Sequence, residues 1–304
     1  MTNKPIASVI IPTYNGAAKI ATLLEALFNQ TESNTEIIVV VDGSKDDTME
    51  VLKRFEKLFG NLKVAVQENG GRARARNRGV EEARGDILIF YDDDMQPAPD
   101  SVAHHVAFHR QYRSSILIGQ QKQAVLNPAS DFQQYRAYIS NHWMKPYGAT
   151  LKKLDRQTLF MTTANCSMPK QIFSQLNGFD EALSDAEDRE FAIRAFDQTI
   201  PLYVDMQNVA LHRENMTCRA YIMRLRQYAR ANDTVDRMHP GFARKTDRTL
   251  SGKRKIVYGL LASSWWVRII DGYNIFRIMP TKIRYRLYDA ITYALSNVYP
   301  QTKI

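Results

Sequence analysis

Hydrophobic positions in the first 119 residues follow two alternating patterns. Apolar runs of strand length, such as residues 8–11 and 37–41, alternate with segments whose apolar residues recur at the period of a helix. One helical stripe between these two runs consists of Ile20, Leu23, Leu24, Leu27 and Phe28. The alternation predicts an α/β fold of repeated βα units, with a mostly parallel sheet and helices on both faces.

The same patterns predict the remaining elements. Further strands are expected at residues 62–66, 86–91, 116–118, 162–168 and 202–204. Further helices are expected at residues 48–59, 72–83, 99–113, 171–176 and 187–196. Residues 120–158 are irregular and aromatic, so we expect a substrate-facing insertion there, and after residue 208 the chain becomes basic and helical.

The composition narrows the class of protein. With 304 residues, 44% hydrophobic and 24% charged, the chain has an ordinary globular composition, which excludes disorder, collagen and a disulfide scaffold. Cys166 and Cys218 fit no C-x-x-C metal pattern and indicate a reducing compartment. No export signal is visible, and the longest apolar stretch, residues 256–270, is interrupted by Arg268 and is too short to cross a bilayer. The net charge of +9 leaves phosphates, nucleic acid and an anionic membrane face as candidate partners.

Three acids, Asp92, Asp93 and Asp94, directly follow the predicted strand at residues 86–91. Ligands of open α/β sheets bind beyond the carboxyl ends of the strands. Clustered carboxylates repel one another unless a cation lies among them, and hard oxygen ligands suit Mg²⁺ or Mn²⁺ next to a diphosphate. The alternative is a solvated acidic turn that caps the next helix, but the position after a buried strand favours a metal site.

Two further segments follow predicted strands. Asp42 ends the run at residues 37–41, where its carboxylate could accept hydrogen bonds from a base or ribose, although a turn-forming aspartate fits this segment equally well. Arginines alternate along residues 72–78, so that Arg72 and Arg76 form a like-charged i,i+4 pair. We expect some of these arginines to meet phosphate or carboxylate, and a nucleic-acid-binding face is the rival interpretation.

Glu187 and Asp188 lie where a helix is expected to begin. Capping of that helix explains either acid, whereas a carboxylate whose pKa is raised by a half-buried site could serve as a general base. His212 follows the apolar run at residues 209–211. A lone histidine is most often structural, and it becomes a metal or phosphate ligand only if the fold carries it back to Asp94.

Read in order, these segments resemble the family 2 glycosyltransferases. The resemblance covers roughly residues 6–232 and rests on five short segments, namely residues 8–16, 42–44, 71–77, 92–94 and 178–188. It implies a GT-A fold, a nucleotide-diphosphate-sugar donor, a divalent metal (Mn²⁺ or Mg²⁺) and inversion at the anomeric carbon. It also implies a catalytic domain at residues 1–232, followed by a helical annex at residues 233–304.

The resemblance assigns a role to each matched position. The residues implied to bind the nucleotide sugar are Pro12, Thr13, Tyr14, Asp42, Arg72, Arg76, Asp92 and Asp93. The residues implied to hold the metal are Asp94, Asp92 and His212. Asp188 matches the catalytic base, with Glu187 beside it, and Val41 departs from the family pattern, which has an acid at that position.

The expected enzyme transfers a hexosyl or N-acetylhexosaminyl group to a hydroxyl on a glycan, a polymer or a lipid-linked saccharide, in polysaccharide biosynthesis for the cell envelope. A metal-dependent nucleotidyl- or phosphotransferase and a basic nucleic-acid-binding module are the alternatives, although no nucleic acid partner is expected. Residues 251–304 mix basic and aromatic side chains. They could contact an anionic membrane surface, the catalytic domain or a second subunit of a homo-oligomer. The expected location is therefore cytoplasmic or peripheral on the inner face of the membrane.

Overall fold

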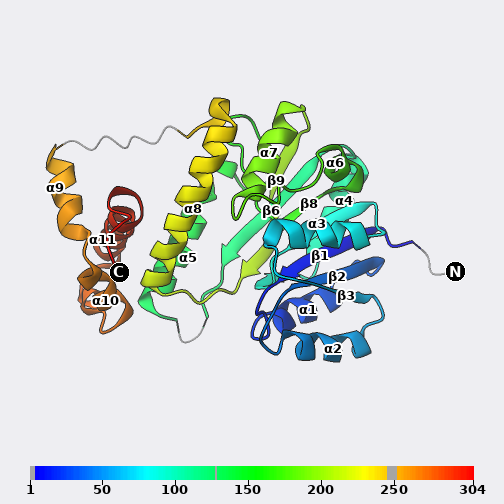
Figure 1. Cartoon of the computed structure of the whole chain (residues 1–304), viewed down its shortest axis with the longest axis horizontal. Coiled ribbons are helices and arrows are strands. Elements are labelled where there is room, and N and C mark those ends of the chain that lie inside the picture. Colours follow the sequence, from blue (N-terminus) through cyan, green and yellow to red (C-terminus); the bar gives the residue numbers. More distant parts are fainter. Residues whose placement is uncertain (1–3, 127–128, 245–251) are drawn as a thin grey trace. The chain divides into compact units, whose positions relative to one another are not determined.

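The computed structural model of the protein describes residues 4–126, 129–244 and 252–304. The chain forms two compact units, and Figure 1 labels most of their helices and strands. The first, here called the sheet unit, comprises the residues up to Ala124 and Trp143–Arg213. The second, here called the helical unit, comprises Val125–His142 and Glu214–Ile304.

Nine strands of the described residues form one sheet in the order β3-β2-β1-β4-β8-β6-β9-β5, with β7 paired to β9. Their bounds are β1 (Ala7–Thr13), β2 (Thr35–Asp42), β3 (Leu62–Gln67), β4 (Ile87–Tyr91), β5 (Met95–Pro97), β6 (Ile116–Gln123), β7 (Lys152–Lys153), β8 (Asn165–Pro169) and β9 (Leu202–His212). Strands β1 to β4 pair in parallel, as do β6 and β9. Strand β8 runs antiparallel to both β4 and β6, and β5 and β7 run antiparallel to β9, so the sheet is mixed, while its longest pairings are parallel as expected.

Two features of the sheet, the direction of β8 and the full length of β9, could not be read from the sequence pattern, each for a physical reason. Residues 165–168 of β8 are buried, so the strand shows no alternation that would reveal its direction. Strand β9 continues to His212 instead of ending near residue 204. Its pairing with β6 shifts register, since Gly119 pairs with Asp205 and Gln120 with Val209. The polar residues of this bulge interrupt the apolar pattern and hide the second half of the strand.

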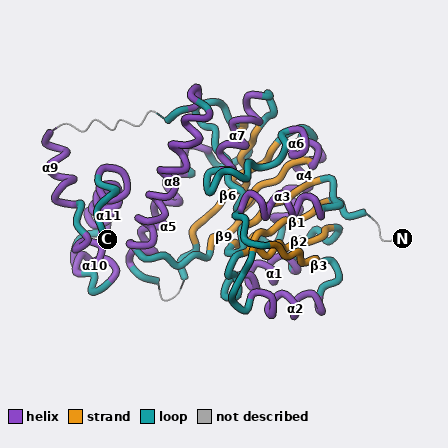
Figure 2. Tube along the Cα trace, in the orientation of Figure 1, coloured by secondary structure: helices purple, strands orange, loops and turns teal. Residues whose placement is uncertain are grey.

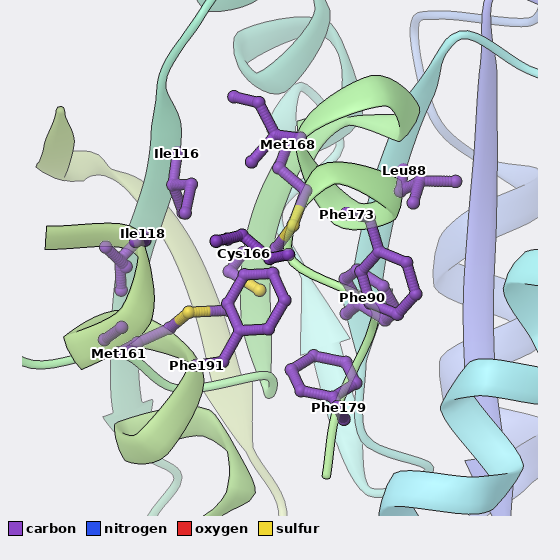
Figure 3. Close-up of a cluster of buried hydrophobic side chains, with 14 of the residues drawn as sticks. Leu88, Phe90, Ile116, Ile118, Met161, Cys166, Met168, Phe173, Phe179 and Phe191 are labelled. Carbon is purple, nitrogen blue, oxygen red and sulfur yellow. The ribbon is translucent and has the colours of Figure 1, made fainter. Parts of the chain in front are cut away.

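Helices cover both faces of the sheet, as expected, and Figure 2 shows the strands between them. The helices of this unit are α1 (Ile20–Phe28), α2 (Thr48–Leu58), α3 (Arg72–Glu82), α4 (Ser101–Gln111), α6 (Lys170–Gln175) and α7 (Glu187–Asp197). Side chains of α1, α2 and α4 pack on one face, and side chains of α3, α6 and α7 pack on the other. Figure 3 shows Phe90, Phe173, Phe179 and Phe191 in this second core. The two cores hold the strands rigidly, which fixes the position of the loops beyond their ends.

The helical unit contains five α-helices among its described residues. They are α5 (Asp131–Trp143, of which the last residue belongs to the sheet unit), α8 (Cys218–Met238), α9 (Gly252–Leu261), α10 (Ser264–Asp271) and α11 (Thr281–Tyr293). The boundary expected at residues 232 and 233 falls inside α8, whereas the compact units divide between Arg213 and Glu214. None of the described helices combines the length and the apolar character needed to span a bilayer.

Helix α5 lies in the segment that the sequence predicts to be irregular. Its inward residues Phe132 and Tyr135 are aromatic, and their rings contact Tyr288 of α11. Burial on this partner stabilises a helix that has little apolar periodicity of its own. A local pattern could not have revealed this, because the partner lies about 150 residues further along the chain.

Candidate active site at the strand ends

The loops after β1 and β2 are joined by hydrogen bonds. The Asn15 backbone N–H donates to Ser44 Oγ over 3.0 Å, and the Gly16 N–H donates to Thr48 Oγ1 over 2.8 Å. A Cβ at Gly16 would lie only 2.1 Å from Thr13 Oγ1, so only glycine fits there. Beside this junction the ring of Tyr14 is half exposed, which leaves it available to a ligand.

The middle carboxylate of the acidic cluster is engaged by the first loop. Asp93 accepts a hydrogen bond of 2.7 Å from the Thr13 hydroxyl and one of 3.0 Å from the Lys19 ammonium group. Burial raises the pKa of Asp93 above its ordinary value, and the charge of Lys19 opposes this shift. Burial alone would lower the pKa of Lys19, but the charges of the aspartates raise it. Asp93 therefore anchors the loop from within, and its burial limits the access of a ligand to the carboxylate.

Sequence reasoning missed Lys19. It occupies the N-cap of α1, where the helix dipole disfavours a positive charge. A cation at this position predicts a nearby anion, and that signal could have pointed to the acidic cluster. Only the fold identifies the anion as Asp93, which is 74 residues away.

The third carboxylate lies beside the histidine at the end of β9. Asp94 Oδ2 is 3.2 Å from His212 Nε2, because β5 and β9 pair Met95 with His212. Burial raises the pKa of Asp94, but the hydrogen bond and charge of His212 bring it below its ordinary value. The other oxygen, Asp94 Oδ1, is buried and has no hydrogen-bond partner among the described residues. An ionised carboxylate oxygen without a partner, next to an imidazole, suits a divalent cation such as Mn²⁺ or Mg²⁺.

Arg76 joins the acidic cluster to the start of α7. Its guanidinium group donates to Asp92 Oδ1 over 2.6 Å and to Glu187 Oε1, and its side chain is only 1% exposed. Burial lowers the pKa of Arg76, but the charges of Asp92 and Glu187 raise it above its ordinary value. The expectation that some of these arginines meet a carboxylate is confirmed, since Arg76 of the pair Arg72 and Arg76 contacts two carboxylates. This bridge brings together segments that are over 90 residues apart.

Asp188 follows directly after this bridge. Part of its side chain reaches solvent, while the Arg189 backbone N–H donates to Asp188 Oδ1 over 2.7 Å. Desolvation and the charge of Glu187 raise the pKa of Asp188 to about 7, although Arg76 acts against the shift. A carboxylate with this pKa can accept a proton near neutral pH.

The sequence left open whether Asp42 binds a ligand or forms a turn, and the structure shows that it stabilises a neighbouring loop. Its carboxylate accepts hydrogen bonds from the backbone N–H groups of Gly70 and Gly71, over 2.8 and 2.9 Å, and from the Gln67 amide. It therefore holds the loop that opens helix α3. Because each carboxylate oxygen has two acceptor sites, Oδ2 still has the capacity to accept another hydrogen bond.

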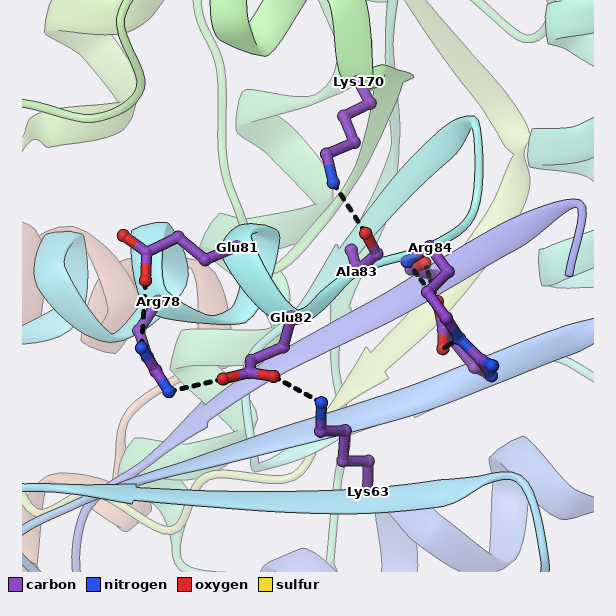
Figure 4. A network of polar contacts seen from close by, with 9 residues as sticks. Lys63, Arg78, Glu81, Glu82, Ala83, Arg84 and Lys170 are labelled. Carbon is purple, nitrogen blue, oxygen red and sulfur yellow. Dashed lines mark hydrogen bonds and ion pairs between the residues drawn. The ribbon is translucent and has the colours of Figure 1, made fainter. Parts of the chain in front are cut away.

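The remaining predicted residues lie at the same end of the sheet. Pro12 is buried near the end of β1, and Arg72 lies in the first turn of α3 with its Nη1 3.9 Å from Asp185 Oδ1. A second buried carboxylate oxygen without a partner among the described residues belongs to Asp185. Arg78, further along α3, pairs instead with Glu81 and Glu82 on the surface (Figure 4). Of these arginines of α3, Arg72 and Arg76 therefore belong to the candidate site, and Arg78 does not.

Comparisons with known proteins show the family and the fold of the chain. Residues 8–176, more than half of the chain, match the protein family described as "Glycosyl transferase family 2". YfnE of Bacillus subtilis (strain 168), described as an uncharacterized glycosyltransferase, is 41% identical over 115 residues, which are 37% of this chain and 29% of YfnE. The aligned part thus spans less than a third of that relative.

Two solved structures show the same fold. Residues 1–349 of S. aureus TarS, in complex with UDP, superpose with a TM-score of 0.57 at 19% identity, and the match covers 98% of this chain and 92% of that solved piece. The mannosyltransferase PcManGT of Pyrobaculum calidifontis, in complex with GDP-Man and Mn²⁺, superposes with a TM-score of 0.64 at 17% identity and covers 99% of this chain and 89% of PcManGT. At these identities the likeness shows the fold alone, which is the GT-A type that the sequence predicts.

Proposed function

This chain belongs to glycosyl transferase family 2, and on that premise we propose that it transfers a sugar, with inversion, from a nucleoside diphosphate sugar to a hydroxyl group of a glycan, polymer or lipid-linked acceptor. One observation carries this proposal. Arg76 ties Asp92, in the acidic cluster, to Glu187, next to an aspartate whose pKa is raised to about 7. Donor-binding acids and a proton acceptor are thereby linked through a single buried side chain.

The donor is held by the strand ends of the sheet unit. Tyr14 offers an exposed ring for a base, and Asp42 offers a remaining acceptor site for a base or ribose. Arg72 is exposed at the start of helix α3 and supplies a positive charge for the diphosphate. TarS and PcManGT were solved with UDP and GDP-Man, so uridine and guanosine diphosphates are the donor classes to test first.

A divalent metal belongs beside Asp94. The unpartnered oxygen of Asp94 and the imidazole of His212 would hold it, with the partly exposed carboxylate of Asp92, from the same acidic cluster, as a further ligand. Such an ion offsets the negative charge that develops on a nucleoside diphosphate leaving group. Asp93 is assigned to the loop rather than to the metal, because Thr13 and Lys19 already engage it.

Asp188 is the proposed general base. It takes the proton of the acceptor hydroxyl while the oxygen attacks the anomeric carbon on the face opposite the nucleotide, and one displacement inverts that centre. Glu187 does not compete for this role, since its carboxylate is paired with Arg76. It acts as a positioning residue whose negative charge keeps the pKa of Asp188 high.

The acceptor is proposed to lie along the aromatic segment after α5. Trp143, Tyr147 and Phe160 form a cluster with ring centroids 4.6–5.9 Å apart, and the Trp143 ring is half exposed. Flat aromatic faces with polar edges suit the apolar faces of sugar rings. This segment packs on the same core as Phe191 of α7, the helix that begins at Glu187.

Two experiments test the proposal. Thermal unfolding with UDP or GDP, each with and without Mn²⁺, should show a rise in melting temperature that depends on the metal, since ligands that bind only the native state stabilise it. Incubation with UDP- and GDP-sugars should then release the free nucleoside diphosphate. Release of pyrophosphate would support a nucleotidyltransferase instead. An axial product from an axial donor, detected by NMR of the anomeric proton, would contradict inversion.

A further inference from the structure

Large apolar side chains point into solvent along one stretch of the helical unit. In α9, Ile256, Val257 and Leu260 are all exposed, and Leu260 is 71% exposed. The exposed apolar side chains of the following elements, up to the start of α11, are Trp265, Tyr273, Ile275, Ile278 and Ile283. Isolated exposed apolar residues are normal, but eight in 28 residues mark an interaction surface.

Inward contacts hold this stretch in place. The rings of Tyr258 and Tyr293 lie 5.4 Å apart, and Trp266 Nε1 donates to the Leu260 carbonyl oxygen over 2.9 Å. The Tyr299 hydroxyl donates to the Lys255 carbonyl oxygen over 3.1 Å. The exposed apolar residues therefore belong to a packed scaffold and form its outward face.

The exposed charges of the same stretch are predominantly positive. Five basic side chains are exposed between residues 252 and 283, namely Arg254, Lys255, Arg268, Arg277 and Lys282. The only acid of this described stretch is Asp271, and its carboxylate accepts hydrogen bonds from the backbone N–H groups of Cys218 and Arg219, at the start of α8. Asp271 is itself exposed, but its carboxylate is engaged by these N–H groups, and the five exposed cations outnumber it beside the apolar groups.

The positive charge of the protein is concentrated in this unit. The helical unit has 18 Lys and Arg against 7 Asp and Glu, whereas the sheet unit has 23 against 25. The whole excess of positive charge therefore resides in the smaller unit.

We infer that the outward face formed by residues 254–283, here called the basic-apolar face, docks on the surface of an anionic lipid bilayer. Stable attachment requires two signals, and this face provides both apolar side chains for the acyl boundary and cations for the headgroups. Trp265 adds a ring of the type that gathers at membrane interfaces. Docking on a second copy of the chain would place the same basic residues opposite one another. The inference does not depend on the proposed reaction.

Vesicle co-sedimentation of the full chain tests this inference. The chain should sediment with vesicles of phosphatidylglycerol and phosphatidylcholine at low salt, and less with phosphatidylcholine alone. The Ile256→Ser/Leu260→Ser double variant should bind about 10- to 100-fold more weakly, since each exposed side chain loses the free energy of its burial. Arg254→Glu/Lys255→Glu should lose about tenfold or more on the anionic vesicles only.

The control is Leu58→Ser, because Leu58 is 72% exposed on α2 of the sheet unit and lies outside the basic-apolar face. It should bind like the unaltered chain, and all variants should keep the same melting temperature. A chain that stays in the supernatant with anionic vesicles would overturn the inference. So would a double variant, Ile256→Ser/Leu260→Ser, that sediments normally, or that dissociates a dimer seen by ultracentrifugation without lipid.

Discussion

The sheet unit and the helical unit use charge in opposite ways. In the sheet unit, basic and acidic residues nearly balance, and those at the strand ends pair inside the protein, as Arg76 does with Asp92 and Glu187. In the helical unit the basic residues of the basic-apolar face lie in solvent. Desolvated pairs shift pKa values over short distances, whereas solvated charges act through a field that salt screens. We propose that the paired charges of the sheet unit serve the transfer reaction and that the solvated charges of the helical unit serve attachment to a membrane.

The largest expected effect is at the proposed base. Asp188→Asn should reduce sugar transfer by about 10²- to 10⁴-fold, because the amide cannot accept the proton of the acceptor hydroxyl. Binding of UDP or GDP with Mn²⁺, measured by calorimetry, should be unchanged. Normal turnover in this variant would remove Asp188 from the mechanism, and loss of nucleotide binding would reassign it to the donor site.

Replacement of Arg76 measures how much its buried ion pairs with Asp92 and Glu187 contribute to stability. Arg76→Met should lower the free energy of unfolding by about 3–5 kcal/mol, because Asp92 and Glu187 lose their common partner and Glu187 is buried. Urea unfolding gives the measurement. The matched control is Arg78→Met on the same helix, where the arginine is exposed and the change should stay within about 0.5 kcal/mol. Equal losses in both variants would show that burial of the pair is not what distinguishes them.

The proposed metal site at Asp94 offers the next contrast. Asp94→Asn should weaken Mn²⁺ binding in the presence of UDP by at least about 10- to 100-fold, since the variant loses the charged oxygen that lacks a partner. Calorimetric titration with Mn²⁺ measures this. The control is Asp86→Asn, because Asp86 is an exposed acid paired with Lys4 at the opposite end of strand β4. Unaltered affinity in the Asp94 variant would place the metal elsewhere in the cluster.

The pH dependence follows from the raised pKa of Asp188. A base works only when it is deprotonated, so the transfer rate should be constant above the pKa of about 7 and fall roughly tenfold per pH unit below it. An aspartate with an ordinary pKa would keep the rate constant down to about pH 5. In Glu187→Gln, loss of the neighbouring charge should move the bend of the rate profile to lower pH. An unmoved bend would mean that Glu187 does not set the pKa.

How far the sequence predicts this arrangement depends on the range of the interaction. The apolar stripe of α1 and the apolar run of β2 are visible in the local sequence, and both elements are found where the periodicity predicts them. The position of Asp92–Asp94 after β4 is equally local. The partner of Lys19, the direction of β8 and the length of α5 depend on residues far along the chain. Hydrophobic periodicity indicates that a side chain is buried, but it does not identify the residues that pack against it.

The smallest expected effect concerns the solvated charges of the helical unit. Arg254→Gln/Lys255→Gln should change the free energy of unfolding by less than about 0.5 kcal/mol, because exposed charges without buried partners contribute little to stability. The rate of transfer to a water-soluble acceptor should also be unchanged. Binding to phosphatidylglycerol vesicles should nevertheless weaken measurably, since each basic residue near an anionic surface contributes about 1 kcal/mol. A variant that lost stability together with vesicle binding would show that these charges hold the fold, and the contrast between the two units would then fail.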